Sequence, residues 1–118
     1  MTAGTALARL KESSAMFAQL ITARLKPGAE DDLPRLFEVI RSAEQPDSGL
    51  IRTVAMRDQS DPGRHYILVL FESEEKARAR EQDERRREAT TAVGSMMGAL
   101  LEGPPEFANL EVVADFAP

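Results

Sequence analysis

The sequence contains no cysteine and no tryptophan, and histidine and tyrosine each occur once. The absence of cysteine excludes disulfides, thiolate metal sites and cysteine nucleophiles, and it fits a reducing cytoplasm. The single histidine, His65, excludes a multi-histidine metal site within one chain. We therefore expect a cytoplasmic protein with neither a metal site nor a cofactor.

Long apolar runs and an excess of positive charge are also missing. No stretch approaches the roughly 20 apolar residues that a helix needs to cross a bilayer. The N-terminus shows no charged segment followed by an apolar core, so we expect no secretory leader. The formal net charge is −5, whereas nucleic-acid binding needs a basic surface. Neither a membrane nor a nucleic acid is therefore expected as a partner.

The residues that are present fit one domain preceded by a short arm. The chain has 118 residues, of which 42% are hydrophobic and 30% charged, as in an ordinary soluble domain with one core. Residues 1–15 are mostly small and polar, and we expect them to form a poorly ordered arm. The alternative is a short amphipathic arm that packs on a partner subunit. Residues 16–118 form the domain.

Two apolar runs predict a β-hairpin in the middle of the chain. They are Leu50–Met56 and Tyr66–Phe71, and the segment between them contains Asp61, Pro62 and Gly63. The second run shows almost no alternation of apolar and polar residues. A strand with one wet face should alternate, so both faces of this strand are expected to be covered.

The elements around the hairpin predict a ferredoxin-like domain of the α+β class. Apolar spacing and turn residues predict strands over residues 17–25 and 106–116 and helices over residues 29–43 and 74–101. The order β-α-β-β-α-β is that of the split βαβ fold, a four-stranded antiparallel sheet with helices on one face. Nothing in the chain remains to cover the second face. We therefore predict a homodimer in which the uncovered faces of two sheets pack together.

The first part of the last helix, residues 74–88, is densely charged with both signs. Such a run is typical of a solvated helix face with ion pairs three or four residues apart. The alternative interpretation is an anion-binding patch formed by Arg85–Arg87.

Several of these motifs, in this order, resemble the antibiotic biosynthesis monooxygenase (ABM) family of dimeric α+β barrels. They are Lys26-Pro27-Gly28 after the first strand, Gly49 before the second, Asp61-Pro62 in the hairpin, and Phe71-Glu72-Ser73-Glu74-Glu75 after the third. The resemblance covers about residues 16–116. It implies a homodimer with a pocket between each sheet and its own helices. Family members include cofactor-independent monooxygenases of polycyclic aromatic substrates, haem-degrading enzymes and proteins of unknown activity.

The sequence departs from this family at its functional positions. Relatives often carry a histidine where this chain reads Arg80-Glu81-Gln82-Asp83, so the resemblance does not support a histidine-ligated haem. The pocket tryptophan of some members is absent. Their first-strand asparagine aligns with Ile21, and Gln19 lies two residues earlier on the same face. No catalytic residue is therefore carried over from the family.

Polar residues within the strands are the first candidates for a ligand pocket. Gln19 and Arg52 lie inside predicted strands, where a polar side chain marks a pocket wall or an exposed rim. His65 has the pKa range of a general base, although a histidine beside a turn is usually exposed. Tyr66 offers a phenol to a ligand, and the alternative is a half-buried strand aromatic.

The last helix supplies the remaining candidates. Gly94 and Gly98 are expected to leave a gap between helix and sheet, lined by Met96 or Met97, because small and flexible residues leave room and adapt to shape. The alternative is plain core packing.

Two classes of function follow from the sequence. The first is a homodimer that binds a small aromatic or apolar molecule, as a cofactor-independent monooxygenase or as a binding protein. The second is a non-catalytic barrel that serves as a structural or interaction module.

Overall fold

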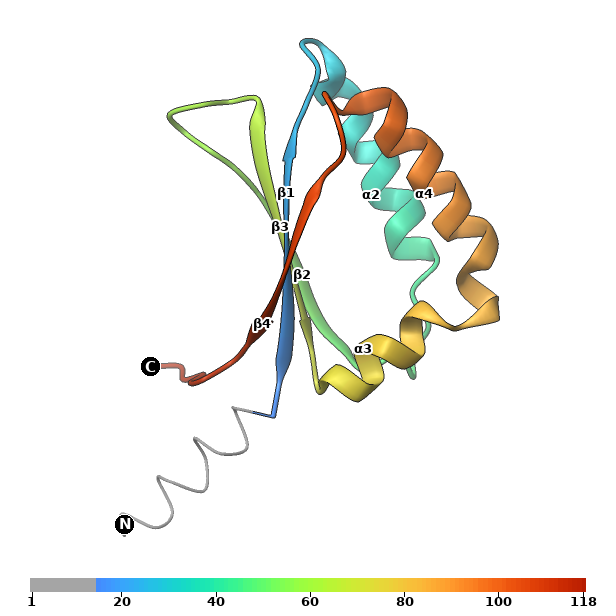
Figure 1. Ribbon diagram of the computed structural model, residues 1–118, viewed down its shortest axis with the longest axis vertical. Helices are drawn as coiled ribbons and strands as arrows, with labels where there is room; N and C mark the ends of the chain where they lie inside the picture. The colour runs from blue at the N-terminus through green and yellow to red at the C-terminus, as the bar shows by residue number, and fades with distance from the viewer. Residues whose placement is uncertain (1–14) are drawn as a thin grey trace, which may run out of the picture.

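The computed structural model describes residues 15–118 and contains a four-stranded antiparallel sheet with helices on one side (Figure 1). The sheet has the strand order β2-β3-β1-β4, with β1 (Phe17–Arg24), β2 (Leu50–Arg57), β3 (Arg64–Phe71) and β4 (Glu106–Glu111). The helices are α2 (Leu33–Ser42), α3 (Glu74–Glu81) and α4 (Arg87–Leu100), with the short 3-10 segments η1 (Ala29–Asp32) and η2 (Glu84–Arg86). The ferredoxin-like arrangement is confirmed. The expected arm lies outside the described residues except for Ala15.

The helix expected over residues 74–101 is divided in two, so that prediction was wrong at Gln82 and Asp83. The backbone of Asp83 is extended, and its carboxylate accepts a hydrogen bond from the Arg85 amide at 2.9 Å. This contact caps η2 and starts a new helical segment in place of continuing α3.

The last strand ends at Glu111, five residues before the predicted end. Glu111 pairs with Phe17, which is the first residue of β1. Beyond this pair, the Val112 amide donates one more hydrogen bond, of 3.2 Å, to the carbonyl of Met16, the residue before β1. The strand stops because its neighbour has no further strand residue to pair with.

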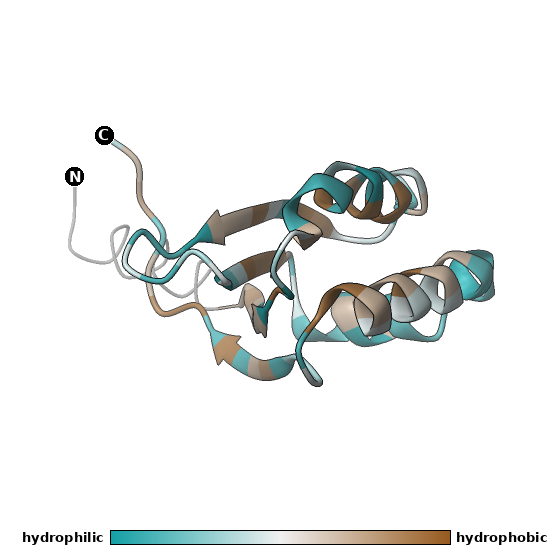
Figure 2. Cartoon of the chain, turned by 90° about the horizontal axis from the view of Figure 1, so that it is seen from above, coloured by the Kyte–Doolittle hydropathy of each residue, from teal (hydrophilic) through white to brown (hydrophobic). Residues whose placement is uncertain are grey.

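The strand register separates two sides of the sheet. On the helix-facing side, Phe17, Val69 and Phe71 pack with Ala77 of α3 in one buried cluster. On the opposite, helix-free side lie the alternate residues, which are mainly apolar: Ala18, Leu20, Val54, Met56, Tyr66, Leu68, Leu70, Ala108 and Leu110. Figure 2 shows hydrophobic residues along the strands as well as on the helices. The helices α2 and α4 lie side by side on the helix-facing side alone (Figure 1).

A second buried cluster lies at the other end of the helix-facing side. It consists of Leu25, Ala29, Leu36, Leu100 and Leu101 and joins the end of β1 to α2 and α4. The apolar positions of α2 recur every three or four residues, which places them on one face of the helix. The two clusters form the core, and each lies near one end of the sheet.

The start of α3 follows the sequence expectation. Ser73 precedes the helix, and its hydroxyl accepts a hydrogen bond from the Lys76 amide at 3.1 Å. Glu74 and Glu75 lie in the first turn, where negative charge complements the helix dipole. Among the helices of residues 15–118, none is both long and apolar enough to cross a bilayer.

Candidate functional site

The helix-facing side of β4 is the least covered part of the sheet. All six residues of β4 are exposed. Phe107 pairs with Ile21 and is 59% exposed, although its register places it on the same side of the sheet as the helices. Two residues further along, Asn109 Oδ1 accepts a hydrogen bond of 3.3 Å from Gln19 Nε2 of β1. An exposed aromatic side chain beside a pair of amides is suited to hold an apolar ring and to hydrogen-bond a polar substituent on it.

A cleft of about 430 Å³ lies at the Asn109 end of this surface, and we call it the β4 cleft. Its volume falls within the range of about 300–1,000 Å³ that is usual for small-molecule sites. The cleft is lined by the segment before β1, the start of β1, the start of α3 and the end of β4: Ala15, Met16, Phe17, Glu74, Asn109, Leu110 and Glu111. Leu110 belongs by register to the helix-free side, so the cleft extends around the edge of the sheet that β4 forms. Its walls therefore combine apolar side chains, one amide and two carboxylates.

A smaller cleft of about 210 Å³ lies at the opposite end of β1 and β4. Its lining is mostly charged: Thr22, Ala23, Arg24, Arg64, Glu102, Pro104 and Glu106. Arg24 donates a hydrogen bond of 3.0 Å to Asp61, and this contact lowers the pKa of the Asp61 carboxyl. Because of its size and polarity, this cleft suits an aromatic ligand less well than the β4 cleft.

The seven candidate residues from the sequence do not come together in one place. Gln19 lies beside the β4 cleft through its bond to Asn109. Arg52 and Tyr66 lie on the helix-free side, because the strands alternate and β2 shifts its register between Leu50 and Arg52. Tyr66 carries the Arg64 guanidinium over its ring at 5.6 Å. Neither Arg52 nor Tyr66 therefore faces the space between sheet and helices.

His65 faces the helix side but stands far from the β4 cleft. It pairs with Ala23, six residues from Phe17 along β1, which corresponds to about 20 Å of strand. Its ring is half-buried, with Nδ1 at 3.2 Å from the Gly63 carbonyl. This position offers no contact with a molecule held in the β4 cleft.

The glycines of α4 do not act as spacers against the sheet. Gly94 and Gly98 are exposed, and a Cβ added at either position would meet no other atom within 4 Å. Neither glycine is packed between α4 and the sheet, whereas Val93, Met96 and Met97 pack on the second cluster with Leu25 and Leu100. The structure thus supports the packing interpretation for the two methionines and gives no gap that depends on the glycines.

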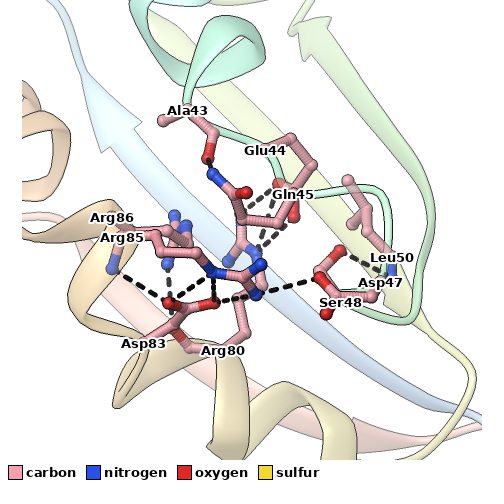
Figure 3. Close-up of polar contacts among 10 residues, drawn as sticks. All are labelled: Ala43, Glu44, Gln45, Asp47, Ser48, Leu50, Arg80, Asp83, Arg85 and Arg86. Carbon is pink, nitrogen blue, oxygen red and sulfur yellow. Dashed lines mark hydrogen bonds and ion pairs between the residues drawn. The ribbon is translucent and has the colours of Figure 1, made fainter.

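The charged segment contains a part-buried ion pair that sequence spacing did not predict. Arg80 of α3 binds Glu44 after α2 with two nitrogens, the shortest contact being 2.7 Å (Figure 3). The two side chains are only 15% and 18% exposed. Burial alone would raise the pKa of Glu44, but hydrogen bonds from Arg80 and Ser48 and the charges of Arg80 and Arg86 outweigh it and lower the pKa. The pair joins α3 to the loop between α2 and β2.

The three consecutive arginines are not an open anion patch. Arg85 binds Asp83 at 2.7 Å and Asp47 at 2.9 Å (Figure 3), and the contact with Arg85 lowers the pKa of Asp83 to about 2. Arg87 pairs with Glu84 at 3.3 Å. Arg86 donates to the Arg80 carbonyl at 3.3 Å, and burial lowers its pKa. The solvated-face interpretation holds for the pairs of Arg78 with Glu74 and Glu81.

Two residues of the β4 surface were missed from sequence. Phe107 and Asn109 alternate with Glu106, Ala108 and Leu110 along the last strand, so the sequence could have placed them on the same side of that strand. The sequence could not predict their partners, because the pairing with Ile21 and Gln19 depends on the register of strands about 90 residues apart.

The comparisons with known proteins agree with this fold. The family model for antibiotic biosynthesis monooxygenase matches residues 16–92. A structure of Caulobacter crescentus assigned to the antibiotic biosynthesis monooxygenases has a TM-score of 0.69 and 16% identity, and covers 92% of this chain and 99% of that one. A Nitrosomonas europaea protein of unknown function has a TM-score of 0.68 and 20% identity, with 90% and 97% covered.

A Chloroflexus aurantiacus structure, also assigned to these monooxygenases, has a TM-score of 0.62 and 20% identity, and covers 86% of this chain and 97% of that one. At these identities the structures show a common fold. No curated protein matches the sequence. The family model covers well over half of the 118 residues. The chain therefore belongs to the antibiotic biosynthesis monooxygenase family.

Proposed function

We propose that the protein is a homodimer that binds a small aromatic or apolar molecule on the helix-facing side of its sheet, at the β4 cleft. One observation carries this proposal: Phe107 is 59% exposed on the helix-facing side of the sheet, next to the Gln19–Asn109 amide pair and the cleft. A bound ring would cover Phe107, while the amides hydrogen-bond its polar group. Removal of apolar area from water drives such binding.

The helix-free side supports the dimer. It presents a continuous set of apolar residues across all four strands, and Met56 and Leu110 on it are 42% and 41% exposed. Contiguous exposed apolar surface of this kind marks an interface. Two copies that pack by these sides form a two-fold, self-complementary contact. This arrangement leaves the helix-facing side of each sheet free for the ligand.

Replacing Phe107 with alanine is expected to weaken binding of 2-naphthylmethanol about tenfold, because the ring loses its main aromatic contact. Phe116→Ala is the matched control, since Phe116 is 88% exposed and follows the last strand. Isothermal titration of the wild type and both variants measures the effect. Equal weakening by the two variants would argue against a site at Phe107.

The family membership extends the proposal to oxygen chemistry on the bound ring. In a cofactor-independent monooxygenation of anthrone, the ring CH2 loses two hydrogens, one oxygen atom of O2 becomes the new carbonyl and the other leaves as water. The protein would position the ring and exclude water. We expect protein-dependent uptake of one O2 per anthraquinone formed, measured with an oxygen electrode and by absorbance. If anthrone binds but no O2 is consumed, the protein is a binding protein and the proposed monooxygenase activity is wrong.

A further inference from the structure

The lining of the β4 cleft has a charge as well as a shape. Glu74 and Glu111 both line it, and no lysine or arginine among residues 15–118 does. The remaining side chains are apolar except for the Asn109 amide. A molecule that enters the cleft therefore passes two carboxylates, and the described part of the chain places no lysine or arginine in the walls.

Arg78, which contacts the lining residues Phe17 and Glu74, is already paired with carboxylates. Arg78 lies over the Phe17 ring at 5.4 Å, and it pairs with Glu74 at 3.2 Å and with Glu81 at 3.1 Å. Glu111 takes part in none of the ion pairs formed among residues 15–118. Of the two lining carboxylates, Glu74 is thus compensated by Arg78 and Glu111 keeps its negative charge among the described residues, while the chain as a whole carries −5. A cleft lined by one sign of charge attracts ligands of the opposite sign and repels those of the same sign.

We propose that the β4 cleft selects aromatic molecules that carry an ammonium group or no charge, and that it rejects aromatic carboxylates. This inference rests on the proposed binding site and specifies the class of its ligand. In the site, the ring lies against the exposed apolar side chains beside Asn109, a polar substituent reaches Asn109, and Glu111 faces the cationic group. Glu111 acts here as a specificity residue through its charge.

Three probes of nearly equal size test this selection: 2-naphthylmethylamine, 2-naphthylmethanol and 2-naphthoate. We expect the ammonium to bind most tightly and the carboxylate least tightly, with about tenfold between these two at low ionic strength. The difference should shrink on raising the salt concentration, because exposed charges are screened over about 10 Å at 0.1 M salt. Titration calorimetry at pH 7 measures all three.

The Glu111→Gln variant assigns the effect to the cleft. It should reduce the preference for ammonium over carboxylate about three- to tenfold and leave the affinity for 2-naphthylmethanol unchanged. Glu106→Gln is the matched control, because Glu106 is an exposed glutamate on the same strand and lines the other cleft. It should leave the preference as in the wild type.

The outcomes separate this inference from the proposed function. If 2-naphthylmethanol binds but the three probes bind equally, or the carboxylate binds best, the inference is overturned and the binding site stands. A preference that survives Glu111→Gln also overturns it, since the selection then arises elsewhere. If none of the probes binds, the inference and the proposed site fall together.

Discussion

Replacing Leu68 with glutamate is expected to convert the proposed homodimer into monomers. Leu68 pairs with Leu20 on one neighbouring strand and with Val54 on the other, at the centre of the helix-free side. In a dimer with two sheets face to face, the new carboxylate would be buried opposite apolar residues with no partner. Burial of an unpaired charge costs several kcal/mol, so we expect the dimer dissociation constant to rise by at least about a hundredfold. Sedimentation equilibrium measures this constant.

The same substitution should leave the fold of the single chain intact, because Leu68 is only half-buried within one subunit. Circular dichroism checks this point. Ala92→Glu, at an exposed position of α4, is the control and should remain dimeric. A wild-type chain that sediments as a monomer at micromolar concentration would contradict the proposed dimer, as would a dimeric Leu68→Glu variant.

The Glu44→Gln substitution should cause the second large effect, a loss of about 2–3 kcal/mol in the free energy of unfolding at pH 7. The change leaves the Arg80 guanidinium without its carboxylate next to part-buried Arg86. Glu84→Gln removes an ion pair whose side chains are 75% and 77% exposed and should cost less than about 1 kcal/mol. Urea unfolding followed by circular dichroism compares the two variants, and equal losses would refute the structural role of the Arg80–Glu44 pair.

The loss in Glu44→Gln should also depend on pH. The pKa of Glu44 is lower in the folded protein than its usual 4.5. A carboxyl whose pKa is depressed by folding stabilises the protein fully above its unfolded pKa and loses that contribution as pH falls through the folded value. The difference between wild type and Glu44→Gln should therefore be full at pH 7 and smaller at pH 3. A difference that stays constant over this range would contradict the assigned cause.

Local features of the fold were predictable where residue chemistry is decisive. The hairpin followed from apolar runs around Asp61, Pro62 and Gly63, and Ser73 marked the start of α3 by its capping hydroxyl. The division of the last helix was not predictable from spacing. A segment of mixed charges has no apolar stripe whose interruption would mark the end of a helix. The sequence pattern therefore does not show where Asp83 caps a new turn.

The candidate site was less accessible from sequence than the fold. Gln19 was identified because a polar side chain inside a strand stands out, but its partner Asn109 depends on the pairing of β1 with β4. The prediction for Gly94 failed because composition says that a helix residue is small but does not say which way it points. Arg80 and Glu44 are 36 residues apart, and only the packing of α3 beside the end of α2 brings them together.

The central claim is that an aromatic ligand lies at the β4 cleft on the helix-facing side, and methyl NMR of methionine tests it most directly. The chain has five methionines, of which Met16 lines the cleft and Met56 lies on the helix-free side. In a protein labelled with ¹³C at the methionine methyl groups, a bound ring of 2-naphthylmethanol should shift the Met16 signal most and leave Met56 unchanged. A shift confined to Met56, or saturable binding that leaves Met16 unshifted, would contradict the claim.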